Sequence, residues 1–375
     1  MGCQARVYSL ANEEKIKIFR NYLLEKSDLF LYYLLSQGIF FMQNNSLILI
    51  DAYSQIFRSF YAIRMLTNSR GEAVNAAFVF TKLLMQLEKN HPSQYGAMLF
   101  DCGKVEFRLK LNPDYKANRP PMPDPLKSQI PLIRRIAEAF GWELMQCEGF
   151  EADDLIGGMA KKYDDCRVSI VSSDKDLSQL IDDRVTMLIP GSGGFDLRDA
   201  AAVENKFGVR PEQMVDYLAL LGDNSDNIPG VPGIGPKSAV EIIRTLGDVE
   251  QWINAPETLD ADNKYVKKLL PHLELLQRNR ELIRLRTELP DTFCSDLPPV
   301  RREPDWAEIR RICEDNQFKS LLKELPELPE KIEKQLSFIA QDEDDLFTFA
   351  ARCDMVDVSQ EAPENEKNEI QGELF

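Results

Sequence analysis

Nine acidic residues stand at five places in the sequence whose contexts favour one shared site over isolated surface charges. Asp51 ends the apolar run LILID, Asp101 ends AMLFD, and two more acids follow the run VSIV. Each alone is more often a helix cap or a loop residue, so only the whole set indicates a site. The set comprises Asp51, Asp101, Glu151, Asp153, Asp154, Asp174, Asp176, Asp223 and Asp226.

The spacing within the groups adds to this expectation. Glu151 and Asp154 are three residues apart at the start of a helical pattern, so they share one helical face that Asp153 cannot fully share. Acids at a helix start are also favoured by the helix dipole alone, and that alternative stays open for this segment. Three carboxylates this close repel one another, so a cation is their natural partner.

Oxygen donors without histidine or cysteine suit Mg²⁺ or Mn²⁺ and disfavour zinc. Two such ions about 4 Å apart would clamp the attacking and leaving oxygens of an in-line phosphoryl displacement. The predicted reaction is therefore hydrolysis of a phosphodiester. The sequence has two histidines, His91 and His272, which leaves little material for catalysis by a histidine base beside a serine or cysteine nucleophile.

A basic stretch follows Asp101 and carries Lys104, Arg108, Lys110, Lys116, Arg119 and Lys127. Lys116 and Arg119 are predicted to contact phosphates and to offset charge in the transition state, and Tyr115 to stack on a base. An ordinary solvated surface is the alternative.

A glycine-rich turn, GVPGIGPKSAVEII at residues 230–243, precedes a second helix. Gly230, Gly233 and Gly235 allow the backbone to approach a phosphate closely, while Lys237 and Arg244 supply positive charge. A plain corner between two helices is the alternative reading of this turn.

Strand-like and helix-like patterns alternate from residue 46. Apolar runs at 47–50, 97–100, 168–171 and 185–189 are separated by helical patterns such as 76–88 and 132–140. This order predicts an α/β fold with a mainly parallel sheet, whose strand ends would bring the acids to one edge.

The chain is expected to divide into five parts. We expect an N-terminal extension of unknown role (1–45), the catalytic domain (46–205), a helical DNA-binding region (206–300), a short helical segment (301–330) and an acidic flexible tail (331–375). The apolar run at 29–42 is shorter than the roughly 20 residues of a membrane span, so no membrane association is expected.

The net charge of −16 does not exclude a nucleic-acid substrate. Residues 327–375 hold 14 acidic and four basic residues, so most of the negative charge lies in the tail. The seven cysteines show neither a CxxC pair nor a disulfide framework, as in a reduced compartment. We expect a monomer in the cytoplasm, associated with the nucleoid.

Several motifs together resemble the 5′-nuclease domain of bacterial DNA polymerase I and the wider flap-endonuclease family. They are FRSFYA after Asp51, FR at 107–108, YKANR at 115–119, FEADD, SSDKDLSQL and GDNSDNIPGVPGIGPKSA. The resemblance covers roughly residues 46–300. It implies a PIN-like domain, a helical arch over the site and a helix–three-turn–helix element.

The resemblance also assigns roles. It makes the nine acids the ligands of two divalent metals, places Lys116 and Arg119 at the scissile phosphate, and makes Arg108 a substrate contact. It implies cleavage of DNA and RNA-primed DNA at 5′ flaps, nicks or ends, as in Okazaki-fragment processing and repair, and a K⁺ ion on backbone oxygens near residues 230–234. A non-catalytic DNA-junction binder and a PIN-type ribonuclease are the alternatives; the complete acid set argues against the first and the glycine-rich turn against the second.

The sequence ends without a polymerase region, so a free-standing nuclease is expected. Its last five residues, QGELF, resemble the peptide by which bacterial replication proteins dock in the sliding clamp. Gln371, Leu374 and Phe375 are therefore predicted to bind the clamp.

Overall fold

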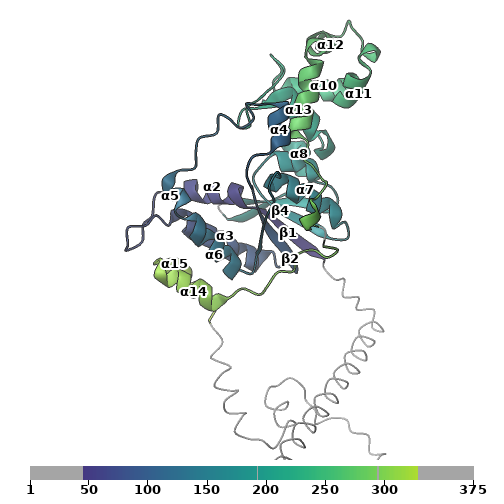
Figure 1. The fold of residues 1–375 in the computed structure, drawn as a ribbon. Coiled ribbons are helices and arrows are strands. Elements are labelled where there is room, and N and C mark those ends of the chain that lie inside the picture. Colours follow the sequence, from purple (N-terminus) through teal and green to yellow (C-terminus); the bar gives the residue numbers. More distant parts are fainter. Residues whose placement is uncertain (1–44, 192, 294, 328–375) are drawn as a thin grey trace, which may run out of the picture. The chain divides into compact units, whose positions relative to one another are not determined.

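A six-stranded sheet forms the centre of the computed structural model, which describes residues 45–191, 193–293 and 295–327 (Figure 1). The strand order is β3-β2-β1-β4-β5-β6, and every pairing is parallel except that of β5 with β6. The strands are β1 (Ser46–Asp51), β2 (Tyr95–Phe100), β3 (Glu143–Gln146), β4 (Arg167–Val171), β5 (Val185–Gly191) and β6 (Gly194–Arg198).

The inner strands are apolar throughout because helices cover both faces of a parallel sheet. In β1, Leu47, Leu49 and Ile50 are fully buried. Helices α2 (Ala52–Ala62), α3 (Asn75–Asn90) and α6 (Ile130–Ala139) lie together on one side, and α7 (Ala152–Lys162) lies on the other (Figure 1).

A helical region follows the sheet. It contains α8 (Ala200–Phe207), α9 (Met214–Leu221), α10 (Pro236–Leu246), α11 (Val249–Asn254), α12 (Lys264–Leu269) and α13 (Leu273–Ile283). A small hairpin of β7 (Gly222–Asp223) and β8 (Ile228–Pro229) separates α9 from α10. Helix α9 packs against both α10 and α13, so the glycine-rich turn between β8 and α10 lies within a helix-packed unit.

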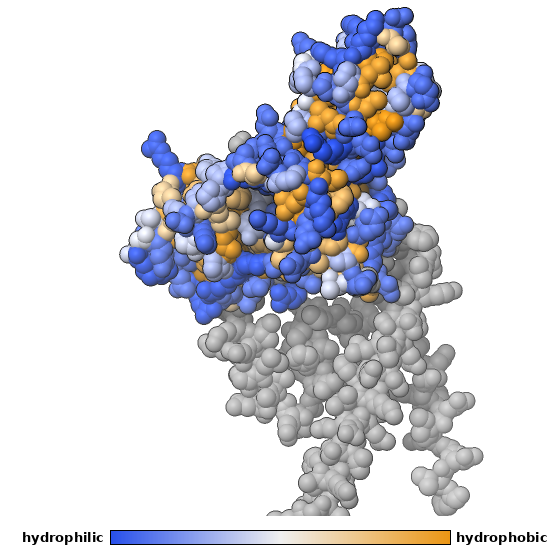
Figure 2. Space-filling view, turned by 45° about the horizontal axis from the view of Figure 1, so that its top comes forward, coloured by the Kyte–Doolittle hydropathy of each residue, from blue (hydrophilic) through white to orange (hydrophobic). Residues whose placement is uncertain are grey.

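The remaining elements are short or terminal. Helix α14 (Trp306–Asp315) packs on α6 and is followed by α15 (Lys319–Leu322). Single-turn 3₁₀ helices lie at Asp176–Leu180, Pro211–Gln213, Pro256–Thr258, Leu270–His272 and Asp291–Phe293. The face drawn in Figure 2 is mostly hydrophilic, with smaller apolar areas between. Among the described helices, none has the length and apolarity that crossing a membrane requires.

The expected α/β architecture is confirmed, with two strands of the central sheet that the sequence analysis missed, besides the hairpin of β7 and β8. Strand β3 is short and half exposed, so its apolar signal is weak, and β6 pairs antiparallel after a tight glycine turn. The expected helical arch is helical only over α4 (Glu106–Leu111) and α5 (Asp124–Lys127). The segment between them, 112–123, contains turns and irregular structure. All but the last residue of the N-terminal extension, the whole tail and the predicted clamp residues lie outside the described part of the chain.

Candidate active site

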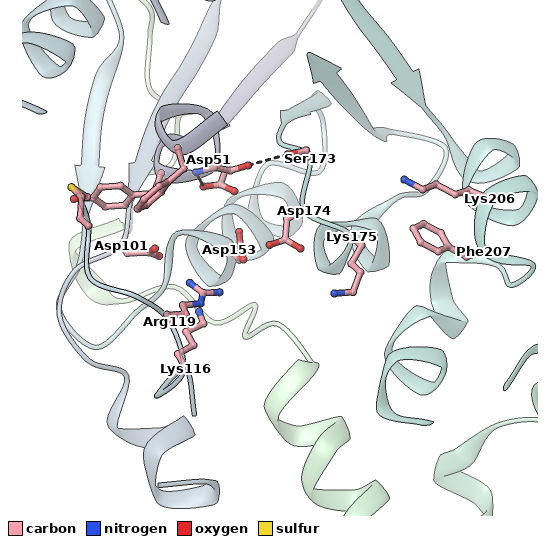
Figure 3. Close-up of a pocket in the computed structure, with 14 residues that line it drawn as sticks. Asp51, Asp101, Lys116, Arg119, Asp153, Ser173, Asp174, Lys175, Lys206 and Phe207 are labelled. Atoms are coloured by element: carbon pink, nitrogen blue, oxygen red, sulfur yellow. Dashed lines mark hydrogen bonds between the residues drawn. The ribbon is translucent and has the colours of Figure 1, made fainter. Parts of the chain in front are cut away.

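The carboxyl ends of three adjacent strands bring acids together at one edge of the sheet. Asp51 ends β1, Asp101 follows β2, and Asp174 lies three residues after β4. These strands are neighbours in the order β2-β1-β4, so the expected convergence is present. With Asp153 from α7, the three acids line a cavity of about 700 Å³ (Figure 3).

The acids of this cavity also anchor local structure. Asp51 caps α2, because its Oδ1 accepts a hydrogen bond from the Ser54 N–H at 3.1 Å, and its Oδ2 accepts one from the Ser172 hydroxyl at 2.8 Å. Asp101 Oδ1 accepts from the Ala152 N–H, at the start of α7, at 2.8 Å. A capping role and a place at the site therefore coexist in the same side chains.

Desolvation and mutual repulsion raise the pKa values of Asp51 and Asp153. Burial, followed by the charge of Asp101, raises the pKa of Asp51 to about 7. Desolvation, followed by the charges of Asp51, Asp174 and Asp101, raises the pKa of Asp153 well above its ordinary value. Within the described ranges, none of the four acids forms an ion pair with a basic side chain. An all-oxygen set in this electrostatic state fits a hard divalent cation.

A second, smaller cavity adjoins the first and shares Lys116, Arg119, Asp153 and Asp174 with it. It is also lined by the acids Glu151, Asp176, Asp223 and Asp226. Burial, followed by the charge of Asp174, raises the pKa of Asp176 to about 8. The Oδ1 atom of Asp176 is buried and accepts no hydrogen bond from any described residue. A buried carboxylate oxygen without a donor fits a cation ligand.

The Lys175 ammonium lies 3.9 Å from Asp176 Oδ1, and Glu151, Asp223 and Asp226 also have basic partners. Lys175 pairs with Asp223, whose pKa is lowered: burial opposes the shift, but the hydrogen bonds from Lys175 and Ser225 outweigh it. Glu151 and Asp226 pair with the cations described below. Among the described residues, no three acidic, histidine or cysteine side chains, in the first cavity or the second, stand in an arrangement that could hold a metal ion without movement.

Without a bound metal, the raised pKa values of these carboxyls should make the stability of the fold depend on pH. Asp51 and Asp176 keep their protons to about pH 7 and 8 in the fold, against an ordinary value of 3.8. The folded chain thus binds more protons than the unfolded chain between these values, so its stability falls as pH rises from 4 to 8. We expect the melting temperature in EDTA to fall between pH 6 and 8.5, and Mg²⁺ to raise it most at the upper end. An equal Mg²⁺ effect across this range, measured by calorimetry, would count against the cation site.

Lys116 and Arg119 reach the site from the irregular segment after α4. The Lys116 ammonium contacts Glu151 Oε1 at 2.7 Å and Asp226 Oδ2 at 3.8 Å, and Arg119 contacts Asp226 Oδ1 at 2.5 Å. Lys116 has φ +57°, which is uncommon outside glycine. Its N–H donates to the Asp226 carbonyl at 3.0 Å, which holds this conformation.

The same segment is fixed to the loop between β7 and β8 by side-chain hydrogen bonds. Asn118 donates to the Asn224 carbonyl at 2.6 Å, and Asn227 donates back to the Asp114 carbonyl at 2.8 Å. Two regions more than 100 residues apart thus hold the basic groups beside the acids. Figure 3 shows Lys116 and Arg119 pointing toward Asp153.

Arg108 and Asp154, predicted to contact substrate and metal, form a buried ion pair in the structure. The Arg108 guanidinium binds both oxygens of Asp154 at 2.7 Å, and their side chains are 1% and 0% exposed. Asp154 Oδ1 also accepts from the Arg286 N–H at 2.9 Å, and Arg108 contacts Glu151 at 3.2 Å. Asp154 lines neither cavity, whereas Arg108 contributes to the wall of the second cavity. The pair is a buried structural ion pair beneath the site.

Tyr115, predicted to stack on a base, is also buried and lines the second cavity. Its ring is 8% exposed, and its hydroxyl donates to Glu151 and Asp226 at 3.1 Å each. Burial and these carboxylates raise the pKa of Tyr115, so the hydroxyl stays protonated. In the structure, Tyr115 therefore orients the carboxylates of Glu151 and Asp226.

The glycine-rich turn meets its expectations in part. Gly235 and Lys237 are exposed at the start of α10, where N–H groups point outward. Gly230 instead packs against α9, because a Cβ there would lie 2.1 Å from the Leu221 carbonyl oxygen. The close approach that glycine allows at this position is thus to the backbone of α9. Gly233 has φ +73°, a conformation that favours glycine. Arg244 donates to the Gly208 carbonyl, away from the turn.

Other residues that line the first cavity were missed. They are Tyr53, Ser54, Phe57, Met122, Ser173, Lys175, Lys206 and Phe207. Lys175 lies between two predicted ligands and was visible in the motif SSDKD, whereas Lys206 and Phe207 end α8 and carry no local signal. Figure 3 shows Lys206 extending toward the acids from the far side of the cavity.

Comparisons with known proteins give a consistent result. Residues 46–208 match the family described as 5′-3′ exonuclease, N-terminal resolvase-like domain, and residues 209–304 match 5′-3′ exonuclease, C-terminal SAM fold. A 5′-3′ exonuclease of Aquifex aeolicus is 36% identical over 76% of this chain and 96% of its own length. The thermostable DNA polymerase I of Thermus thermophilus is 36% identical over 78% of this chain and 35% of its own. The chain thus spans about a third of that polymerase.

Solved structures agree with the fold. The bacteriophage T5 flap endonuclease, in a pseudo-enzyme–product complex with DNA and metal ions, aligns with 75% of this chain and 98% of its own. The TM-score is 0.53 and the identity 25%. A T5 5′-exonuclease with bound zinc aligns with the same score and identity. With both family domains matched in order and nearly the whole Aquifex exonuclease aligned, this chain belongs to the 5′-3′ exonuclease family of nucleases.

Proposed function

We propose that the protein is a structure-specific 5′-3′ exonuclease and 5′-flap endonuclease that hydrolyses phosphodiesters with Mg²⁺ or Mn²⁺. One observation carries the proposal: Asp51, Asp101, Asp153 and Asp174 line one cavity together with Lys116 and Arg119. Carboxylates that could bind cations thus lie beside basic side chains that could bind a phosphate. The T5 relative was solved with DNA and metal ions, which supports a DNA substrate for this chain.

The acids would hold two cations. The four acids of the first cavity would bind one, and Asp176 with Asp174, Asp223 and Asp226 would bind the other. Bound divalent cations polarise phosphoryl oxygens and make water nucleophilic near neutral pH. Asp174 lines both cavities, so both groups of acids include it.

The basic residues act on the phosphate itself. Lys116 and Arg119 now neutralise Glu151 and Asp226 at the border between the two cavities. A scissile phosphate there would draw them from these carboxylates, and they would then offset the charge that develops on its oxygens. Tyr115 and Ser225 would keep Asp226 and Asp223 in place through the hydrogen bonds that they already make.

The turn before α10 would hold the duplex next to the cut. Lys237 and the outward N–H groups of α10 offer backbone contacts without base recognition, as junction-specific cutting requires. We propose that the enzyme removes 5′ flaps and RNA primers in Okazaki-fragment processing and repair. We also propose that residues 371–375 dock in the sliding clamp; unchanged clamp capture after their deletion would discard that partner.

The direct test is cleavage of labelled 5′-flap substrates by the full chain. With Mg²⁺ we expect cutting at the junction of a DNA flap, none in EDTA, and little on single-stranded DNA without a duplex. Matched RNA flaps provide the second arm. Cutting confined to RNA would replace this proposal with a ribonuclease, and tight flap binding without any metal-dependent cutting would replace it with a junction binder.

A further inference from the structure

A lysine from α12 rests directly on the glycine-rich turn. The Nζ atom of Lys268 donates a hydrogen bond to the Gly233 carbonyl oxygen at 2.7 Å. A Cβ added at Gly233 would lie 2.9 Å from this ammonium group, so the contact is tight. The turn thus carries a positive charge supplied by the chain itself.

This contact bears on the K⁺ ion expected near residues 230–234. Proteins hold K⁺ with carbonyl oxygens that together replace its hydration shell. Here the Gly233 carbonyl accepts from Lys268, and the Val231 carbonyl accepts from the Ile234 N–H at 3.1 Å. With two of its carbonyls engaged and an ammonium group in place, the turn does not fit a K⁺ ion.

The other lysines of α12 have acidic partners. Lys264 lies 3.9 Å from Glu241, and Lys267 lies 3.4 Å from Asp262. Lys268 forms no ion pair with any residue in the described ranges. An ammonium has three N–H donors, and Gly233 takes one, so two can still point at an anion.

The surroundings of Lys268 suit a phosphate. Helix α10 begins at Pro236, three residues after Gly233, and its first N–H groups have no partner within the helix. The exposed Lys237 stands at the same end of α10. Helix N–H groups and an ammonium together form an anion site that recognises no particular base.

We infer that Lys268 replaces the monovalent cation at this turn and contacts a backbone phosphate of the DNA duplex. The inference rests on the proposed function, in which the turn holds DNA. Because the positive charge belongs to the Lys268 side chain, binding of DNA at this turn requires no K⁺. Lys268 accounts for one phosphate contact.

The test is equilibrium binding of the full chain to a labelled nicked duplex in EDTA, which prevents cutting. KCl is compared with choline chloride at equal ionic strength. We expect wild-type affinity to differ by less than about twofold between these salts. Lys268→Met should weaken binding about five- to tenfold in both and lower the slope of log K against log salt by about 0.9, as expected for one lost phosphate contact.

Lys267→Met is the matched control, because the neighbouring ammonium already pairs with Asp262. Its affinity and slope should stay near wild type, Lys268→Arg should retain most of the affinity, and melting temperatures verify folding. A wild-type affinity at least fivefold lower in choline, or equal effects of Lys267→Met and Lys268→Met, would overturn the inference. Neither result affects the proposed function, which fails separately if the wild type does not cut flaps.

Discussion

Asp174→Asn should lower the rate of Mg²⁺-dependent flap cutting by at least about 1,000-fold, with flap binding still measurable. Asp174 lines both cavities, so the substitution weakens both proposed cation sites. Losing the stabilisation of the transition state by the cations raises the activation free energy by several kcal/mol, and each increase of about 1.4 kcal/mol lowers the rate tenfold. Single-turnover cutting of a labelled flap measures the effect.

Two further variants separate cation binding from phosphate contact. Asp183→Asn changes an exposed acid on the loop before β5 and should leave the rate unchanged. Lys116→Met should slow cutting by about 10²- to 10³-fold, since it removes one charge that stabilises the transition state, and should leave Mn²⁺ affinity intact. If Asp174→Asn cuts at more than a tenth of the wild-type rate, the site is wrongly assigned.

Arg108→Met should destabilise the fold by about 3–5 kcal/mol, because it leaves the Asp154 carboxylate buried without its partner. Both side chains are almost fully buried, so water cannot replace the lost contact. Urea denaturation of the metal-free protein measures the change. The matched control is Arg119→Met, whose half-exposed pair with Asp226 should be worth at most about 1 kcal/mol.

The double variant Arg108→Met/Asp154→Leu distinguishes a structural pair from a metal ligand. An apolar pair of similar volume should recover most of the lost stability, because no buried charge remains. The double variant should also retain metal-dependent cutting. A stable but inactive double variant would show that Asp154 belongs to the cation site after all.

The sequence was sufficient where topology alone determines position. Short apolar runs alternating with helices predict a parallel sheet, and the carboxyl ends of its strands must meet at one edge. Asp51, Asp101 and Asp174 follow from that rule, and the structure places them on adjacent strands.

The first turn of α7 shows where such reasoning stops. Spacing predicts that Glu151 and Asp154 share a face, and both do contact Arg108. Which face meets the cavity depends on packing across the chain, and it is Asp153 that lines the cavity. A motif also says nothing about burial, so Arg108 and Tyr115 resembled surface contacts although both are buried in the wall of the second cavity.

Gly230 and Lys268 make the same point for the turn. A glycine-rich sequence does not tell whether a glycine faces a ligand or a neighbouring helix, and Gly230 faces α9. Lys268 lies 35 residues from the carbonyl that it contacts, so no local pattern indicates the pair.

Diffraction from crystals grown with Mn²⁺, recorded to detect its anomalous scattering, tests the central claim most directly, because Mn²⁺ takes the same oxygen donors as Mg²⁺. The account predicts a Mn²⁺ ion bound by carboxylates among Asp51, Asp101, Asp153 and Asp174, and a second ion beside Asp176. Ordered Mn²⁺ found only at other surfaces, in a protein that still cuts flaps with Mn²⁺, would contradict it.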